Sequence, residues 1–247
     1  MTLYDRIARI YDPWSRSVTE DIGFYVDLAL ASGGPVVELA VGTGRIGVPI
    51  AEAGLPVIGV DSSPEMLAGA RAAAEGAGVE HLLDLRLGDL REPPVDERVP
   101  LVICPFRSLL HMETEGEKVR ALRAARSLLR PDGRFAFDVF APTPEDIAET
   151  HDRWLEREPG IWERARWDEG SRTLSLSVRS GDAEVTFSLH WLSAPEWLEL
   201  LEQAGFEVEG LYGWFDLRPY EGDEDMVFVV RKAGTPRTRG SRPRGNP

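Results

Sequence analysis

The chain has 247 residues, of which 43% are hydrophobic and 28% charged, and its formal net charge is −14. This length and apolar content are those of one large α/β domain, or of one domain with a small cap. So acidic a surface repels the phosphate backbone of nucleic acids, which argues against a nucleic-acid substrate and favours a neutral or cationic small molecule.

Signals for a membrane or for an oxidising compartment are missing from the sequence. No apolar run approaches the roughly 18 residues that cross a bilayer, and the first ten residues, MTLYDRIARI, are charged. Cys104 is the one cysteine, so an internal disulfide is impossible. We therefore expect a cytoplasmic protein that does not bind a membrane.

Residues 1–31 carry two helical patterns, separated by the turn Tyr11-Asp12-Pro13-Trp14. In the second pattern apolar residues recur at helical spacing and stop at Ser32-Gly33-Gly34. Tyr11 and Trp14 fit two interpretations: they pack a helix onto the domain, or they close a pocket.

Strand and helix patterns alternate between residues 35 and 140. The predicted strands are 35–40, 56–61, 82–88, 99–104 and 133–140, and the predicted helices are 45–54, 64–76 and 115–130. Apolar strands that alternate with helices indicate a parallel sheet with helices on both faces. Ligands of such folds bind beyond the carboxyl ends of the strands. The candidate site residues are therefore those that end the predicted strands, namely Glu38 to Gly44, Asp61, Gly88, Asp89, and Cys104 to Phe106.

Residues 141–192 interrupt this alternation. Three segments, GIWERARW, RTLSLSVRS and AEVTFSLHWL, are separated by turn signals at 168–170 and 181–182. They predict a three-stranded antiparallel insertion. Five of the seven tryptophans lie in or beside it, so we expect it to cover the sheet edge, a substrate or the second subunit of a homodimer.

The last part of the chain returns to the first pattern. A helix is expected from Ser193, where Glu196 completes a capping box, to Gly205. The segments FEVEGLYGWFD and DMVFVVRK are expected to pair as two antiparallel strands at the sheet edge. Residues 233–247, with arginines but no apolar face, are expected to form a disordered basic tail.

Together these elements predict an α/β, Rossmann-like, doubly wound fold with a mostly parallel seven-stranded sheet. Residues 1–140, which include an N-terminal helical lid, and residues 193–232 would form this main domain. Residues 141–192 would be an inserted antiparallel β subdomain that precedes the last helix and serves the substrate or an oligomer contact.

The motif around which the chain is organised is VVELAVGTGRIG at residues 36–47. Its glycines let the backbone approach a ligand, and the helix that follows offers free N–H groups. Gly42, Gly44 and Gly47 satisfy the GxGxxG dinucleotide pattern, and Asp61 lies 19 residues beyond Gly42, as a ribose-binding acid would. An NAD(P)-dependent oxidoreductase is therefore one interpretation of the loop.

Glu38 argues for a different ligand. This acid stands four residues before Gly42, where its carboxylate would repel a pyrophosphate lying over the loop. A ligand that carries an ammonium group would instead be attracted to it.

Several segments, in chain order, resemble the motifs of class I S-adenosylmethionine (SAM)-dependent methyltransferases. They are ELAVGTGRIG, VIGVDSSPEML, LRLGDLRE, VICPFRSLLHM and LLRPDGRFAFDVF, followed by the paired ends AGFEVEGLYGWFD and MVFVVRKA. The likeness covers residues 1–232. One departure is Ala40, where many members have glycine, and alanine is small enough that we expect cofactor binding to survive.

The resemblance implies that SAM is the cofactor. It assigns Asp61 to the ribose hydroxyls, Met66 to packing near the adenine and Asp89 to the adenine amino group. The other expected cofactor-binding residues are Tyr11, Glu38, Ala40, Gly42, Gly44, Arg45, Ser62, Gly88, Leu90, Cys104, Pro105 and Phe106. Arg45 fits either an ion pair with the cofactor carboxylate or a solvated position, and Cys104 also fits a small apolar residue at a strand end.

Methyl transfer from a sulfonium is an in-line displacement, which needs acceptor and methyl group about 3 Å apart in a water-poor site. An amine or hydroxyl acceptor must lose a proton, so a base helps. His111, in the loop after the fourth strand, is the first candidate, with a structural role as the alternative. Tyr11 and His190 are further candidates, although His190 also fits a solvent-facing position. No metal-ligand spacing occurs, so we expect no metal site.

Three functions follow from these residues. The motifs favour a SAM-dependent methyltransferase that acts on a nitrogen or oxygen of a small-molecule acceptor. Its layout is similar to that of small-molecule N-methyltransferases for amino sugars or glycine-like amines, with O-methylation left open. The alternatives are the NAD(P)-dependent oxidoreductase and a SAM-binding subunit without activity of its own.

Overall fold

The computed structural model describes residues 3–222 and 224–233. One group of strands comprises β1 (Val36–Leu39), β2 (Val57–Asp61), β3 (Leu83–Leu87), β4 (Val99–Cys104), β5 (Leu129–Phe140), β10 (Phe206–Tyr212) and β11 (Asp225–Lys232). A second group comprises β6 (Trp154–Glu158), β7 (Ile161–Asp168), β8 (Thr173–Ser180) and β9 (Ala183–His190). The helices are α1 (Leu3–Trp14), α2 (Glu20–Ser32), α3 (Gly47–Glu52), α4 (Pro64–Ala77), α5 (Glu115–Leu128), α6 (Pro144–Thr150) and α7 (Ala194–Ala204), with short 3-10 turns η1 (Glu80–Leu82) and η2 (Ser108–His111).

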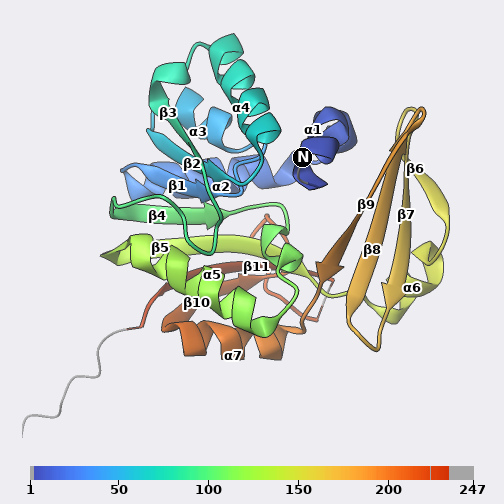
Figure 1. The fold of residues 1–247 in the computed structure, drawn as a ribbon. Helices are drawn as coiled ribbons and strands as arrows, with labels where there is room; N and C mark the ends of the chain where they lie inside the picture. The colour runs from blue at the N-terminus through green and yellow to red at the C-terminus, as the bar shows by residue number, and fades with distance from the viewer. Residues whose placement is uncertain (1–2, 223, 234–247) are drawn as a thin grey trace, which may run out of the picture.

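The described strands form two sheets (Figure 1). The large sheet has seven strands in the order β10-β11-β5-β4-β1-β2-β3, and the small sheet has the order β6-β7-β8-β9. Strands β1 to β5 run parallel to their neighbours, whereas β10 and β11 are antiparallel at one edge. The predicted doubly wound, mostly parallel fold with an antiparallel insertion is confirmed.

Alternation along the central strands explains the layers. In β4, Leu101 and Ile103 point to a core shared with α2 and α3, while Val102 and Cys104 point to the core of α5 and α7. All four are fully buried. A strand with both faces covered must be apolar throughout, as VPLVIC is. The continuous apolar pattern of β4 therefore indicates that both faces of the sheet are covered.

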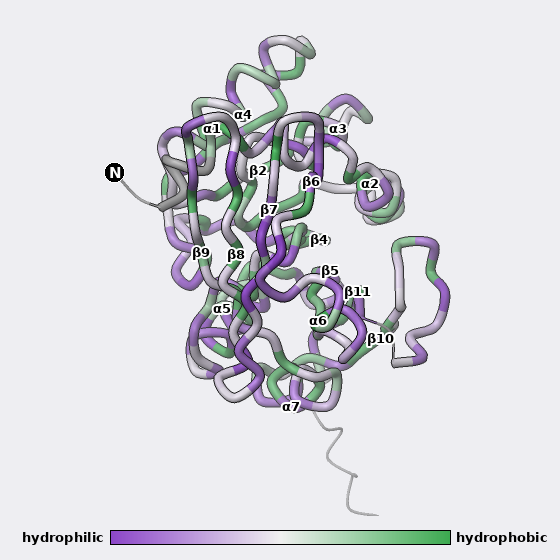
Figure 2. Tube along the Cα trace, turned by 90° about the vertical axis from the view of Figure 1, so that its right-hand side faces the viewer, coloured by the Kyte–Doolittle hydropathy of each residue, from purple (hydrophilic) through white to green (hydrophobic). Residues whose placement is uncertain are grey.

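The small sheet stands upright at one end of the large one, beside the carboxyl ends of its parallel strands (Figure 1). Figure 2 views it from outside, with α1 at one end of its strands and α7 at the other, and shows that much of β7 is hydrophilic. The inner apolar residues of β8 and β9, such as Leu174, Leu176 and Phe187, belong to the same buried cluster as the α5 and α7 core. The two sheets are thus joined by continuous hydrophobic packing.

Two predicted boundaries are wrong. The helix predicted to residue 130 ends at Leu128, and β5 begins at Leu129 and includes the Pro131-Asp132-Gly133 turn signal. A residue before proline disfavours helical backbone, which explains the early helix end. A side chain on Gly133 would place its Cβ 3.0 Å from the Val99 carbonyl oxygen, so glycine lets this segment lie against β4.

The insertion has four strands rather than the three predicted. Strand β6, WLERE, pairs with β7 at the edge of the small sheet, and its mostly polar sequence lacks the alternation of a half-buried strand. The capping box of Ser193 and Glu196 and the left-handed Gly205 that ends α7 are confirmed. The predicted disordered tail lies, apart from Ala233, outside the described residues. Among the described residues, the helices are all too short or too polar to span a bilayer.

Phe137 provides a test of the core. It is fully buried, and its ring stacks on those of Phe135 and Phe228, with centroids 5.1 and 5.0 Å apart, and lies tilted 5.6 Å from that of Trp197. We expect Phe137→Ala to lower the free energy of unfolding by about 3–5 kcal/mol, because the cavity it leaves cannot collapse. Urea denaturation would measure the loss. Leu198→Ala on α7, whose side chain is 40% exposed, is the matched control and should cost less than about 0.5 kcal/mol.

Candidate active site

A cavity of about 1080 Å³ lies at the carboxyl ends of the parallel strands, between the large sheet, α1 and the inner face of the small sheet. The ends of successive strands and the segments that follow them line it. They contribute Ala40, Gly42, Asp61, Ser62, Met66, Gly88, Asp89, Leu90, Phe106, Arg107, Ser108 and His111. The small sheet contributes Leu174, Leu176, Phe187 and Leu189, and α1 contributes Tyr11 and Trp14. Sequence reasoning placed the site at this edge, and this cavity lies there.

The loop after β1 has left-handed backbone at three positions. The φ angles of Ala40, Gly42 and Gly44 are 59°, 56° and 85°. Glycine adopts this conformation without strain, whereas alanine costs about 1–2 kcal/mol. The left-handed φ at position 40 is the physical reason for glycine in the family pattern. The methyl group of Ala40 is nevertheless accommodated in the cavity wall.

Asp61, at the end of β2, links this loop to the neighbouring strand. Its Oδ2 accepts a hydrogen bond from the Gly42 N–H at 2.9 Å, and its Oδ1 accepts one from the Ser63 N–H at 2.9 Å. The carboxylate also lines the cavity. Because each carboxylate oxygen can accept two hydrogen bonds, Asp61 can hold the loop and still accept donors from a ligand.

Five of the expected cofactor-binding residues do not line the cavity: Glu38, Gly44, Arg45, Cys104 and Pro105. Cys104 is buried in the core, as the alternative interpretation of that residue held. Gly44 lies against α3 and α4, where an added Cβ would come 3.0 Å from Val48 of α3 and 3.4 Å from Ala70 of α4.

Glu38 lies behind the glycine loop. It is 2% exposed, its Oε2 has no hydrogen-bond partner among the described residues, and an added Cβ on Gly47 would lie 2.7 Å from that oxygen. Burial raises the pKa of Glu38 well above its ordinary value. The glycine at position 47 therefore leaves room for this carboxyl group, which lies behind the glycine loop.

Arg45 is neither solvated nor part of the cavity wall. Its guanidinium forms two hydrogen bonds to the carboxylate of Asp21, at 2.8 and 2.6 Å, and lies 4.6 Å from the ring centroid of Phe106. Asp21 is almost fully buried, so its charge requires a close cation. This ion pair fastens α2 to the glycine loop. Sequence reasoning missed it because the two residues are 24 positions apart and lie in different elements.

The loop after β3 brings Gly88, Asp89 and Leu90 to the cavity, opposite Met66 from α4. An added Cβ on Gly88 would come 2.3 Å from Pro94, so this position has no room for a side chain. Asp89 accepts a hydrogen bond from the Arg91 N–H at 2.8 Å and forms an ion pair with its guanidinium, which lowers the pKa of Asp89. These contacts fix the direction of the carboxylate.

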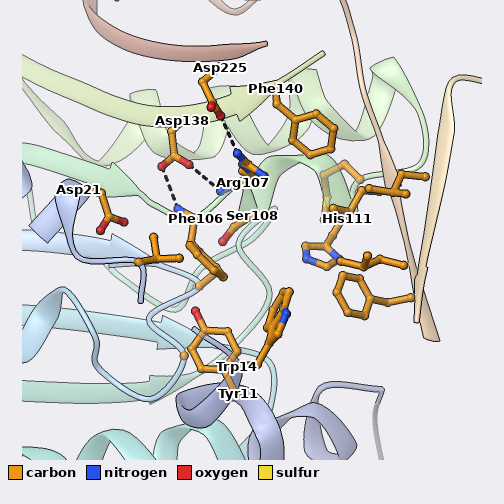
Figure 3. A pocket seen from close by; sticks show the side chains of 18 of the residues that line it. Tyr11, Trp14, Asp21, Phe106, Arg107, Ser108, His111, Asp138, Phe140 and Asp225 are labelled. Atoms are coloured by element: carbon orange, nitrogen blue, oxygen red, sulfur yellow. Dashed lines mark hydrogen bonds and ion pairs between the residues drawn. The ribbon is translucent and has the colours of Figure 1, made fainter. Parts of the chain in front are cut away.

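The loop after β4 is held by a buried carboxylate that sequence reasoning did not find. Phe106 and Arg107 are consecutive left-handed residues, with φ of 57° and 60°. Their backbone N–H groups donate to Asp138 of β5 at 2.8 and 3.0 Å (Figure 3). The Tyr25 hydroxyl donates to the same carboxylate at 2.7 Å. Burial raises the pKa of Asp138 to about 6. The available signal was a lone acid within the apolar run FAFDVF.

Further charged groups surround Arg107 at the upper end of the cavity in Figure 3. Arg107 donates to Asp225 at 2.6 Å and lies 4.7 Å from the ring centroid of Phe140. Glu224 and Asp146 also line this part, and burial raises the pKa of Glu224 to about 7. Sequence reasoning missed this cluster because its members come from three separate elements.

Of the three expected bases, Tyr11 and His111 line the cavity and His190 does not. Tyr11 packs edge-on against Phe106, and burial raises its pKa to about 12. The ring of His111 lies 5.6 Å from that of Phe187, and burial lowers its pKa to about 4. His190 is on the other face of β9, where its Nδ1 lies 3.2 Å from the Thr173 hydroxyl. The proposal of His190 as a base is therefore not supported, because the side chains of a strand alternate between faces.

The comparisons with known proteins agree with this geometry. Residues 36–133 match a family model described as a methyltransferase domain. The putative methyltransferase YqeM of Bacillus subtilis is 27% identical over 94% of this chain and 98% of its own length. The glycine/sarcosine/dimethylglycine N-methyltransferase of Actinopolyspora halophila is 24% identical over 89% of this chain but only 39% of its own length.

A solved structure extends the likeness to the whole fold. The CcbJ methyltransferase from Streptomyces caelestis is 28% identical, with a TM-score of 0.81 over 95% of this chain and 99% of that chain. The fold, the loop motifs and the relatives of this chain are those expected of class I SAM-dependent methyltransferases. The chain carries a methyltransferase domain and is similar over nearly its whole length to methyltransferases, which supports a SAM-dependent methyltransferase enzyme. The oxidoreductase and the inactive SAM-binding subunit are not supported by these findings.

The low pKa of His111 predicts a pH-dependent stability. Between pH 6.5 and about 4 the unfolded chain binds a proton on this side chain and the native state does not. Native stability is therefore complete above pH 6.5 and falls as the pH is lowered toward 4. We expect His111→Gln to lose less stability over this range, measured by urea denaturation at several pH values. His81→Gln, at an exposed position, should behave as the wild type does; equal pH slopes for all three proteins would contradict the assignment.

Proposed function

We propose that this methyltransferase transfers a methyl group from SAM to the nitrogen of a small-molecule amine. The observation that carries the proposal is the cluster of carboxylates at the upper end of the cavity. Asp138, Asp146, Glu224 and Asp225 line this part, with Arg107 as the cation among them. Carboxylates attract an ammonium group, whereas a neutral hydroxyl gains far less from them.

The cavity has room for two ligands. Its volume of about 1080 Å³ lies at the top of the range usual for one small-molecule site, about 300–1,000 Å³. SAM, when bound, supplies a methyl group on a positively charged sulfonium. The residues of the glycine loop and of the β2 and β3 ends fit such a nucleoside, because they combine open backbone with fixed carboxylates.

In the proposed binding mode Asp61 accepts hydrogen bonds from the ribose hydroxyls. Met66 and Leu90 pack against the adenine, and Asp89 accepts from its amino group. Ala40 and Gly42 line the methionine portion, beneath Tyr11. Glu38 and Arg45, which lie outside the cavity wall, would act through the shape and charge of the loop rather than by direct contact.

The acceptor half of the cavity has aromatic and aliphatic walls. Trp14 packs against Phe106 and Phe187 at 5.9 and 6.0 Å between centroids, and its Nε1 donates to Glu163 at 3.1 Å. Aromatic faces stabilise a nearby cation and exclude water from the reacting atoms. We assign residues 141–192 to this role, as an inserted subdomain that forms the acceptor wall.

Relatives add support for an amine acceptor. The Actinopolyspora halophila enzyme is named for N-methylation of glycine, sarcosine and dimethylglycine. The CalS10 protein of Micromonospora echinaspora is described as an amino pentose methyltransferase. Both names refer to small amines, which is the acceptor class that the carboxylate cluster favours here.

The cofactor assignment predicts the behaviour of Asp61 variants. We expect Asp61→Ala to raise the dissociation constant for SAM by roughly tenfold or more, because it removes charge-assisted hydrogen bonds to the ligand and the restraint on Gly42. Isothermal titration calorimetry would measure it. Asp27→Ala, an exposed acid on α2, is the control and should bind SAM as the wild type does. Equal affinities for both variants would remove Asp61 from the site.

The acceptor assignment is tested with pairs of amines and hydroxyl analogues of the same shape. Glycine with glycolate, and an amino sugar with its parent sugar, would be incubated with enzyme and isotopically labelled SAM, and the products identified by mass spectrometry. We expect methylation of amines at least about tenfold faster than of their hydroxyl partners, because only the amines carry a charge that the carboxylates can stabilise. Methylation of hydroxyl partners alone would establish an O-methyltransferase instead.

A further inference from the structure

We propose that Glu224 is the catalytic carboxylate that binds the acceptor ammonium and takes its proton before methyl transfer. This inference rests on the proposed N-methyltransferase function and adds the residue that prepares the nucleophile. Glu224 lies immediately before β11 and lines the acceptor half of the cavity.

The chemistry requires such a group. An alkylammonium has no lone pair and cannot attack the methyl carbon. One N–H bond must break, its proton passes to the carboxylate, and the electron pair stays on nitrogen. That lone pair then forms the bond to the methyl carbon as the carbon–sulfur bond breaks and its electrons stay on sulfur. The product is a methylated ammonium, and Glu224 later releases its proton to solvent.

The expected bases do not fit this task. His111, with a pKa of about 4, is too weak a base to hold a proton taken from an alkylammonium at neutral pH. Tyr11, with a pKa of about 12, stays protonated. Asp138 already accepts three hydrogen bonds, from the Tyr25 hydroxyl and two backbone N–H groups, and these hold the β4 loop.

The other acids of the cluster are also engaged. Asp225 accepts a hydrogen bond from Arg107 at 2.6 Å. Asp146 caps α6, where its Oδ2 accepts from the Thr143 backbone and hydroxyl at 2.8 and 2.7 Å. The carboxylate of Glu224, by contrast, has no hydrogen bond or ion pair with another residue of the described ranges 3–222 and 224–233. It is the member of the cluster that can turn to a ligand.

The backbone at Glu224 is held by a hydrogen bond. Its carbonyl accepts a hydrogen bond from the Ala141 N–H at 2.9 Å, next to the end of β5. The charged groups that face it are Arg107 from the β4 loop, Asp225 from β11 and Asp146 from α6. Partial burial, together with the two acids, outweighs the arginine, so the pKa of Glu224 is raised to about 7. A base with this pKa exchanges protons readily near neutral pH.

The test uses the amine that the wild-type enzyme methylates fastest in the panel, together with a β-fluorinated analogue whose nitrogen is largely neutral at pH 7.5. For the wild type, kcat/KM with the basic amine should rise with pH and level off above about pH 7, where Glu224 is ionised. Glu224→Gln should lower kcat/KM about 100-fold and lose this limb of the profile. Glu224→Asp should restore part of the rise of kcat/KM with pH.

Two readouts and a control variant separate a catalytic role from a structural one. Glu224→Gln should bind SAM within about twofold of the wild type and should methylate the fluorinated amine at nearly the wild-type rate, since that amine needs no base. Glu221→Gln, an exposed neighbour, should match the wild type throughout.

Equal losses of Glu224→Gln on both amines, or an unchanged pH profile, would overturn the role of Glu224 while leaving N-methylation intact. A wild-type enzyme that methylates none of the amines would overturn the proposed function and this inference with it.

Discussion

The site depends on the carboxylate of Asp138. Three donors converge on it: the Tyr25 hydroxyl from α2 and the consecutive N–H groups of Phe106 and Arg107. Two adjacent left-handed residues are strained, and they persist only where other contacts hold them. Asp138 supplies those contacts. In doing so it positions Phe106, whose ring packs edge-on against Tyr11 of α1, and Arg107, which donates a hydrogen bond to Asp225 of β11.

A second carboxylate holds backbone N–H groups in the loop after β1, the strand next to β4, and in the loop after β2. Asp61 holds the N–H groups of Gly42 and Ser63 as Asp138 holds those of the β4 loop. At both strand ends a side-chain carboxylate, rather than a strand partner, satisfies the backbone, so the loops can open toward the ligand without leaving buried N–H groups unpaired. The Arg45–Asp21 ion pair adds a third fastening, from α2 to the glycine loop. Together these contacts set the positions of the loops before any ligand binds.

The sequence predicted the sheet, the cavity edge and most of its lining because these follow from local patterns. Apolar runs mark strands, and the residue after a parallel strand must lie at the ligand edge whatever its partners are. It could not predict Asp138, Glu224 or the pairing of Arg45. Their roles depend on burial and on neighbours distant along the chain, such as Tyr25 for Asp138 and Asp21 for Arg45. The edge strand β6 was not predicted either, because a mostly polar strand lacks the alternation of apolar and polar residues that marks a half-buried strand.

The connectivity of the small sheet has a consequence for how such a protein can diversify. Its strands β6 to β9 form one uninterrupted stretch of chain, and the sheet supplies an entire wall of the cavity without contributing to the opposite wall, which the loops after β1, β2 and β3 provide. The segment between Phe140 and Ser193 could be changed by duplication, exchange or laboratory grafting. Such a change would reshape the wall formed by the small sheet and leave the wall formed by the loops after β1, β2 and β3 unchanged. Under the proposed function, the part of the protein that selects the acceptor is therefore one continuous segment of the chain.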